Sequence, residues 1–160
     1  MRREKLLPFG PPLFLLAAAL ISARPAEETL NLTIAAPDSP VHESNVALEV
    51  TMTNRTSLPM TLFKTNPGCD FTAEVKDTDG RTVPLSQTGA ELSRCQQRLI
   101  VGRRILVTLK PGESTEESYP IDLYYSLPRA GTFTVQLTRE VPAQPKLVAR
   151  SNEIVLNLAR

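Results

Sequence analysis

The chain has 160 residues, of which 41% are hydrophobic, 22% charged and 5% aromatic. This length and composition fit one folded domain and exclude an intrinsically disordered chain. Eighteen Lys and Arg residues balance 17 Asp and Glu residues, so no overall charge attracts nucleic acid or an anionic membrane. One His and two Cys leave little material for a multi-histidine or zinc site, and we expect no metal or other cofactor.

Residues 1–23 have the three parts of a secretory signal peptide. A positively charged start precedes the apolar run 13–21, and small residues end the segment at Ala23. We therefore expect cleavage after Ala23 and a single mature domain, residues 24–160, that is secreted or periplasmic. Retention of the uncleaved segment as a membrane anchor remains the alternative. Cleavage changes the formal net charge from +1 to −1, because the segment carries three basic residues and one acidic residue.

Apolar and polar residues alternate along much of the mature chain, and this period of two predicts β-strands. In chain order the predicted strands are 30–34, 46–53, 60–64, 71–75, 81–85, 105–109, 118–123, 132–138 and 153–158. Turns rich in Pro, Gly, Asn and Asp separate them, and 86–98 is irregular, with one possible helical turn at 90–94. Short strands at this spacing without a long helix predict an antiparallel sandwich or barrel.

The two cysteines are predicted to form a structural disulfide. Cys69 and Cys95 are the only pair, and an exported chain meets an oxidising compartment. Their separation of 26 positions differs from the C-x-x-C spacing of redox catalysts. Closing a loop of this size is expected to stabilise the fold by about 3 kcal/mol. A catalytic thiol would need a histidine partner, and His42 is the only histidine.

Three local signatures resemble those of immunoglobulin-like sandwich domains in secreted bacterial proteins. They are the strand 46–53 with 54–56 and Leu62-Phe63, the strand 71–75 with the turn 77–80 and Val83, and the series 109–113, 121–123 and 130–135. Their order is similar to that of BsuPI-type proteinase-inhibitor domains, and the third also resembles the β-domain of deuterolysin-type metallopeptidases. The resemblance implies an all-β, antiparallel immunoglobulin-like β-sandwich of about eight strands.

The sequence contains no recognisable set of catalytic residues, and we expect the protein not to be an enzyme. His42 lies in a polar connection, and the sequence contains no G-x-S-x-G, S-x-x-K or H-E-x-x-H motif. The deuterolysin resemblance therefore does not extend to peptidase activity. Asp77 and Asp79 fit a hairpin turn better than a calcium-binding loop.

Two groups of side chains are candidates for partner binding: Arg94, Arg98, Arg103 and Arg104, and the pair Tyr124 and Tyr125. The arginines crowd the segment after the irregular stretch and could present a surface to an anion or an acidic partner, although arginines there could simply keep a strand soluble. The tyrosines could be exposed aromatic anchors, although the alternation around them places one in the core.

These observations favour a non-catalytic extracytoplasmic binding domain with a protein partner. The sharpest version is a proteinase inhibitor whose rigid loop lies in the disulfide-tethered stretch 65–97. The alternative is a structural or accessory module of a cell-envelope assembly that pairs through an edge strand. Nucleic acid is not an expected partner, and the membrane is one only if the signal peptide is retained.

Overall fold

The computed structural model describes residues 30–37, 41–42, 46–95, 105–141 and 144–159. The predicted signal peptide and Arg98, Arg103 and Arg104 lie outside these ranges. None of the helices within the described ranges is both long and apolar enough to cross a membrane.

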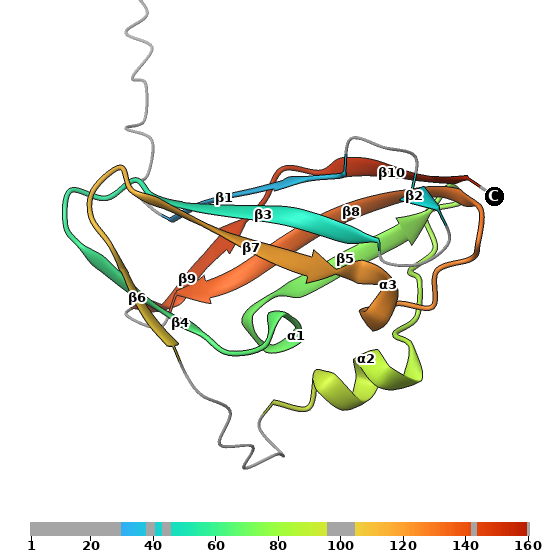
Figure 1. Ribbon diagram of the computed structural model, residues 1–160, viewed down its shortest axis with the longest axis horizontal. Helices are drawn as coiled ribbons and strands as arrows, with labels where there is room; N and C mark the ends of the chain where they lie inside the picture. The colour runs from blue at the N-terminus through green and yellow to red at the C-terminus, as the bar shows by residue number, and fades with distance from the viewer. Residues whose placement is uncertain (1–29, 38–40, 43–45, 96–104, 142–143, 160) are drawn as a thin grey trace, which may run out of the picture.

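Two antiparallel sheets face each other (Figure 1). Sheet A has the order β1 (Leu30–Ala35), β3 (Ala47–Asn54), β7 (Ser114–Pro120). Sheet B has the order β2 (Val41–His42), β10 (Ile154–Ala159), β8 (Gly131–Val141), β5 (Thr72–Asp77), and β9 (Gln144–Arg150) also pairs with β8. The predicted all-β antiparallel sandwich is confirmed, with one departure: β2 runs parallel to β10.

A two-stranded ribbon and three short helices complete the fold. The β4–β6 ribbon consists of β4 (Met60–Lys64) and β6 (Ile105–Leu109) and lies at one end of the sandwich. The helices are α1 (Pro67–Asp70), α2 (Gln87–Leu92) and α3 (Ile121–Tyr124). Helices α2 and α3 lie close together on the lower side of the view in Figure 1.

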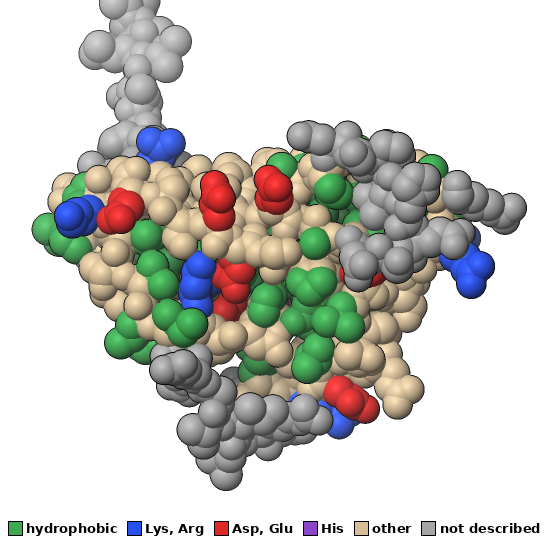
Figure 2. Space-filling view, in the orientation of Figure 1, with side chains coloured by type: hydrophobic (Ala, Val, Ile, Leu, Met, Phe, Trp, Pro, Cys, Tyr) green, Lys and Arg blue, Asp and Glu red, His purple; other side chains and the backbone are tan. Residues whose placement is uncertain are grey.

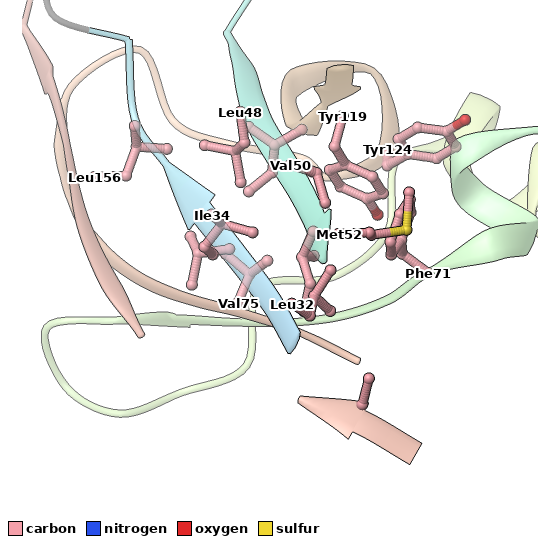
Figure 3. Packing of buried hydrophobic residues seen from close by; sticks show 14 of the residues in the cluster. Leu32, Ile34, Leu48, Val50, Met52, Phe71, Val75, Tyr119, Tyr124 and Leu156 are labelled. Atoms are coloured by element: carbon pink, nitrogen blue, oxygen red, sulfur yellow. The ribbon is translucent and has the colours of Figure 1, made fainter. Parts of the chain in front are cut away.

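Alternating side chains of the two sheets fill the space between them (Figure 3). In β1 every second residue is buried, and Leu32 and Ile34 lie opposite Met52 and Val50 of β3. The facing series from β8 includes the fully buried Val135 and Leu137. Burying a side chain of this size contributes about 1.5–3 kcal/mol, so these strands hold the fold together chiefly by removing apolar area from water.

Two asparagines tie separate parts of the sandwich together. The Asn152 side chain accepts a hydrogen bond from the Ile34 amide at 2.8 Å and donates one to the Ile34 carbonyl at 3.0 Å, which joins sheet B to the edge of sheet A. Asn54 is fully buried, and its Nδ2 donates to the carbonyls of Leu58 and Leu109 at 2.8 and 2.9 Å. Its Oδ1 accepts from the amide and hydroxyl of Thr56, so one side chain joins two turns.

The structure differs from the sequence-based prediction in several places. The predicted strand 81–85 makes only isolated bridges at Thr82 and Leu85, because Pro84 between them has no N–H to donate. The predicted strand 118–123 is the end of β7 followed by α3, and β7 itself begins earlier, at Ser114. Strands β2 and β9 and helix α1 were not predicted, and β2 includes His42, which the sequence analysis placed in a polar connection. The helical turn expected at 90–94 overlaps α2, which begins at Gln87.

Candidate functional site

The predicted disulfide between Cys69 and Cys95 is present and joins α1 to the turn that follows α2. The Cα atoms of the two cysteines are 5.6 Å apart, within the usual range for a disulfide. Helix α1 begins after Asn66, whose side chain accepts the Gly68 amide at 3.0 Å, and Pro67 occupies its first turn. The covalent link therefore fixes the position of a helix that is too short to be stable by itself.

Tyr124 and Tyr125 are not the exposed anchors that the sequence suggested, because both are buried. The Tyr124 ring stacks on Tyr119 with centroids 5.0 Å apart, and its hydroxyl donates to Asn66 Oδ1. The Tyr125 hydroxyl donates to the Ala73 carbonyl at 2.7 Å. The chain turns into α3 here, so side chains no longer alternate between a buried and an exposed face, and both rings enter the interior.

Two glycines allow α1 and α2 to approach α3 closely. A Cβ atom at Gly68 would collide with the Tyr124 ring, and one at Gly89 would collide with the Tyr124 backbone carbonyl. Neither position has room for a side chain. Together with the disulfide, these contacts make the three short helices one closely packed unit.

A cleft of about 560 Å³ opens where α1 meets the β4–β6 ribbon and the β8–β9 part of sheet B. Its lining residues are Phe63, Cys69, Asp70, Thr72, Thr138, Arg139, Glu140 and Val148. These residues come from five elements that are distant in the sequence, namely β4, α1, β5, β8 and β9. The disulfide-linked helix therefore supplies part of the cleft wall.

Arg139, which lines the cleft, is only 3% exposed and contacts a carbonyl oxygen, a sulfur atom and an aromatic ring. Its guanidinium donates to the Phe63 carbonyl, lies 3.3 Å from Met52 Sδ and stacks 4.9 Å from the Phe71 ring centroid. Burial lowers the pKa of Arg139, and the carboxylates of Asp70 and, to a lesser extent, Glu117 act in the opposite direction. Much of the charge of Arg139 is therefore balanced inside the protein.

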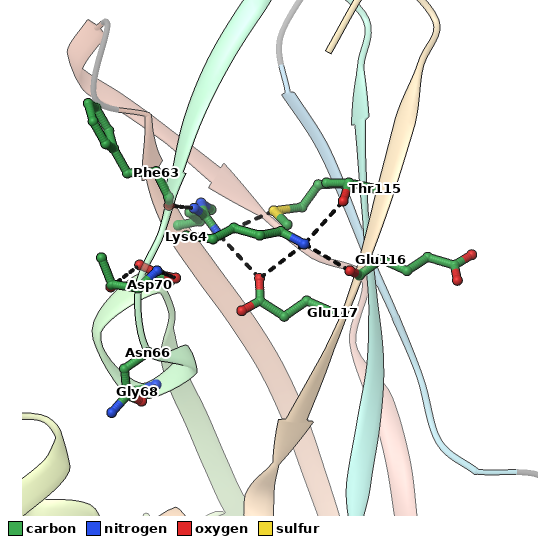
Figure 4. A network of polar contacts seen from close by, with 11 residues as sticks. Phe63, Lys64, Asn66, Gly68, Asp70, Thr115, Glu116 and Glu117 are labelled. Carbon is green, nitrogen blue, oxygen red and sulfur yellow. Dashed lines mark hydrogen bonds and ion pairs between the residues drawn. The ribbon is translucent and has the colours of Figure 1, made fainter. Parts of the chain in front are cut away.

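Glu117 and Lys64 extend this network to the open edge between β4 and β7 (Figure 4). Lys64 Nζ donates to Thr115 Oγ1 at 3.1 Å and to the Glu116 carbonyl at 2.9 Å. Glu117 Oε2 lies 4.0 Å from Lys64 Nζ and 3.9 Å from Arg139 Nη1, and it accepts no hydrogen bond from any described residue. Burial raises the pKa of Glu117, although Lys64 opposes this rise.

Asp70 is held at the end of α1 by the loop before it. Its two carboxylate oxygens accept the amide and the hydroxyl of Thr65, each at 2.7 Å. The side chain of Asp70 is therefore oriented before any ligand is present.

Exposed apolar side chains surround the cleft. Phe63 and Val148 line it and are 38% and 49% exposed, and Leu106, which lies opposite Phe63 in the ribbon, is 62% exposed. Figure 2 shows that hydrophobic side chains also lie on both sides of an adjacent basic and acidic pair on the face of the molecule that it presents. Apolar surface gathered at one place on a small domain is typical of a site that contacts another molecule.

Of the described site residues that the sequence predicted, Cys69 lines the cleft, whereas Arg94, Tyr124 and Tyr125 do not. Arg94 is exposed beside the disulfide, and the other three candidate arginines lie outside the described ranges. Arg139 was missed, although it occupies an inward position in the otherwise apolar alternation of β8. A charged residue at an inward strand position was the available signal.

The cleft offers groups for binding. Its titratable side chains are Asp70, Arg139 and Glu140, and the Cys69 sulfur is held in the disulfide. Within the described part of the chain, no three His, Cys, Asp or Glu residues are grouped so that they could hold a metal ion.

Comparison with known proteins identifies no family for this chain. No protein-family description matches the chain, so the resemblance to BsuPI-type domains is not supported by a family match. No curated protein matches it either. A Bacteroides uniformis beta-glucuronidase aligns with a TM-score of 0.38 and 14% identity. Beta-glucuronidase 2 of the same species, covalently bound to cyclophellitol-6-carboxylate aziridine, aligns with a TM-score of 0.39 and 15% identity. Each alignment covers 80% of this chain but only 13% of the other, and likeness at this level carries no conclusion about function.

Proposed function

We propose that the chain is a non-catalytic binding domain that acts outside the cytoplasm. The observation that carries the proposal is the cleft beside the disulfide, which combines exposed apolar walls with oriented polar groups. A site that is already ordered binds at a lower entropic cost than one that must be ordered by its ligand. The disulfide supports an oxidising compartment, in agreement with the predicted signal peptide.

Site-specific photo-cross-linking in the source cells tests this proposal. The photoreactive residue p-benzoylphenylalanine replaces Phe63 in the cleft or, as a matched control, the exposed Asn31 on the outer face of sheet A. Binding at the cleft predicts a covalent adduct of defined mass from position 63 and none from position 31. Equal labelling at both positions, or no adduct at position 63, would refute it.

A proteinase inhibitor remains the sharpest version of this function. Over its described part, the stretch 65–97 folds into α1, β5 and α2 instead of one extended loop. An inhibitory contact would therefore use the cleft side of α1 or the β4–β6 ribbon. Residues 24–160 should then inhibit a secreted protease at a stoichiometric ratio, and the absence of inhibition across a protease panel would eliminate this version.

The β4–β6 ribbon favours a second candidate, an accessory module of a cell-envelope assembly. Among the described strands, β6 pairs only with β4, and Ile105 and Leu106 on β6 are exposed. An edge strand of this kind can accept a strand from another chain. This candidate predicts that Leu106→Lys releases the protein from a stable envelope complex, whereas the inhibitor version predicts recovery of a protease.

A further inference from the structure

We infer that the cleft takes an extended segment of a partner protein in which a Lys or Arg residue stands next to apolar residues. The inference rests on the proposed binding function and names its ligand class. It depends on three properties of the cleft: its exposed charge, its apolar walls and the strand face at its base.

The exposed charge of the cleft is negative. The charged residues that line it are Asp70, Glu140 and Arg139. Arg139 is 3% exposed, and its charge is already opposed by Asp70 and Glu117, so it offers little to a ligand. Glu140 is exposed and makes no ion pair with any described residue.

Arg150 does not neutralise this charge from within the cleft. It lies opposite Thr138 in the strand register but is not among the residues that line the cleft. Its charge also acts on Glu74, whose pKa is lowered mainly by its hydrogen bond with Lys76 and less by Arg150. A cation in the cleft would therefore gain an attractive contact with Glu140, and Asp70, which already opposes the charge of Arg139, adds to the negative charge of the lining.

The apolar walls indicate that the cation belongs to a larger molecule. Phe63 of β4 and Val148 of β9 both line the cleft, and Leu106, opposite Phe63 in the ribbon, continues the apolar surface. A small ammonium ion would leave this surface in water. A peptide side chain on either side of the Lys or Arg residue would cover it.

The base of the cleft suits an extended chain. Thr72 and Thr138 come from paired positions of the adjacent strands β5 and β8, so the surface between the walls is a polar sheet face. The cleft volume of about 560 Å³ lies in the range of ligand sites. Alternate side chains of an extended segment point to opposite sides, which allows one to meet the carboxylates and its neighbours to meet the walls.

Selection from a displayed random-peptide library tests the inference on the disulfide-bonded domain, residues 24–160. Affinities of synthetic, fluorescein-labelled copies of the recovered peptides are then measured by fluorescence anisotropy. We expect recovered sequences to be enriched in Lys or Arg flanked by apolar residues. Glu140→Gln should weaken binding about tenfold, because it removes one charge-assisted contact.

Two matched controls separate the site from the rest of the surface. Glu49→Gln removes an exposed glutamate on β3 of sheet A and should leave the affinity within about twofold of wild type. Phe63→Ala should weaken binding, whereas Leu58→Ala, at a 70% exposed position outside the cleft, should not. Equal effects of the cleft variants and their controls would overturn the inference.

Recovery of peptides without basic residues, or of no peptide at all, would also overturn the inference. The proposed binding function fails separately, in the photo-cross-linking experiment. An adduct at position 63 together with a failed peptide selection would keep the binding domain and reject a basic peptide segment as its ligand.

Discussion

The two carboxylates whose charges act on Arg139 are predicted to have different effects on stability when they are neutralised. Asp70 is the stronger counter-charge for the buried guanidinium, and it also accepts two hydrogen bonds from Thr65. Glu117 lies 3.9 Å from Arg139 Nη1 and accepts no hydrogen bond on its buried Oε2 from the described residues. Asp70→Asn should therefore destabilise the fold, and Glu117→Gln should not.

The expected magnitudes follow from these contacts. Asp70→Asn loses one charge-assisted hydrogen bond and the main counter-charge of a buried cation. Because Asp70 itself is only half-buried, we expect the free energy of unfolding to fall by about 2 kcal/mol. Glu117→Gln removes a carboxylate for which burial outweighs the attraction of Lys64 and Arg139. We expect this variant to be as stable as wild type, or more stable by up to about 1 kcal/mol, at neutral pH.

The pH dependence of the Glu117→Gln effect gives a second readout. The folded-state pKa of Glu117 is raised above its ordinary value of 4.5, so the folded protein binds more protons than the unfolded chain just above pH 4.5. The stability of wild type therefore falls as the pH rises through this window, and the variant lacks this loss. The difference in the free energy of unfolding should vanish below pH 4.5, where the carboxyl is protonated in both states, and favour the variant above it.

Urea unfolding of the oxidised protein, followed by far-UV circular dichroism at several pH values, measures both effects. Equal m-values for the three proteins would establish that the comparison concerns stability alone. The reasoning is refuted if Glu117→Gln costs as much as Asp70→Asn, since Glu117 would then be the principal counter-charge of Arg139.

Three further variants test features of the fold by the same urea assay. Gly89→Ala should lower the free energy of unfolding by about 2 kcal/mol, because the new Cβ would collide with the α3 backbone. Gly80→Ala should lower it by about 1 kcal/mol, because Gly80 lies in open space but has a φ of 77°. A smaller loss at Gly89 than at Gly80 would contradict the close packing of α2 on α3. Asn54→Ala should lower the free energy of unfolding by about 3 kcal/mol because it removes the buried amide that donates to the Leu58 and Leu109 carbonyls and accepts from Thr56, although the Thr56 hydroxyl still donates to Leu58. A loss below about 1 kcal/mol would show that water replaces the amide. Replacing Cys69 and Cys95 together by serine should lower the free energy of unfolding by about 3 kcal/mol. If the fully reduced wild-type protein is as stable as the oxidised protein, the disulfide does not stabilise the fold.

The strands that could be predicted are those with one face in the core. In β1, β3 and β8 apolar residues recur at every second position because one side of each strand is buried. Strand β7 was only partly predicted, because its sequence from Ser114 to Pro120 is mostly polar and its single fully buried residue is Tyr119. An edge strand with little buried surface leaves a weak pattern in the sequence.

The disulfide could be predicted from counting, whereas the cleft could not. Cys69 and Cys95 had no other partner, so the pairing needed no knowledge of the fold. The cleft depends on which strands become neighbours: β5 and β8 bring Thr72 and Thr138 together from positions 66 residues apart. Sequence alternation shows which face of a strand is buried, but it does not show which other strand lies beside it.

The burial of Asn54 also affects how the protein can be produced. Asn31-Leu32-Thr33 and Asn54-Arg55-Thr56 both have the acceptor sequence for an N-linked glycan. Asn31 is exposed, but the Asn54 amide is buried and donates both of its hydrogens to carbonyls. A eukaryotic secretory host that attached sugar to the nascent chain at Asn54 would block folding of those molecules, so the folded product would carry sugar at Asn31 alone.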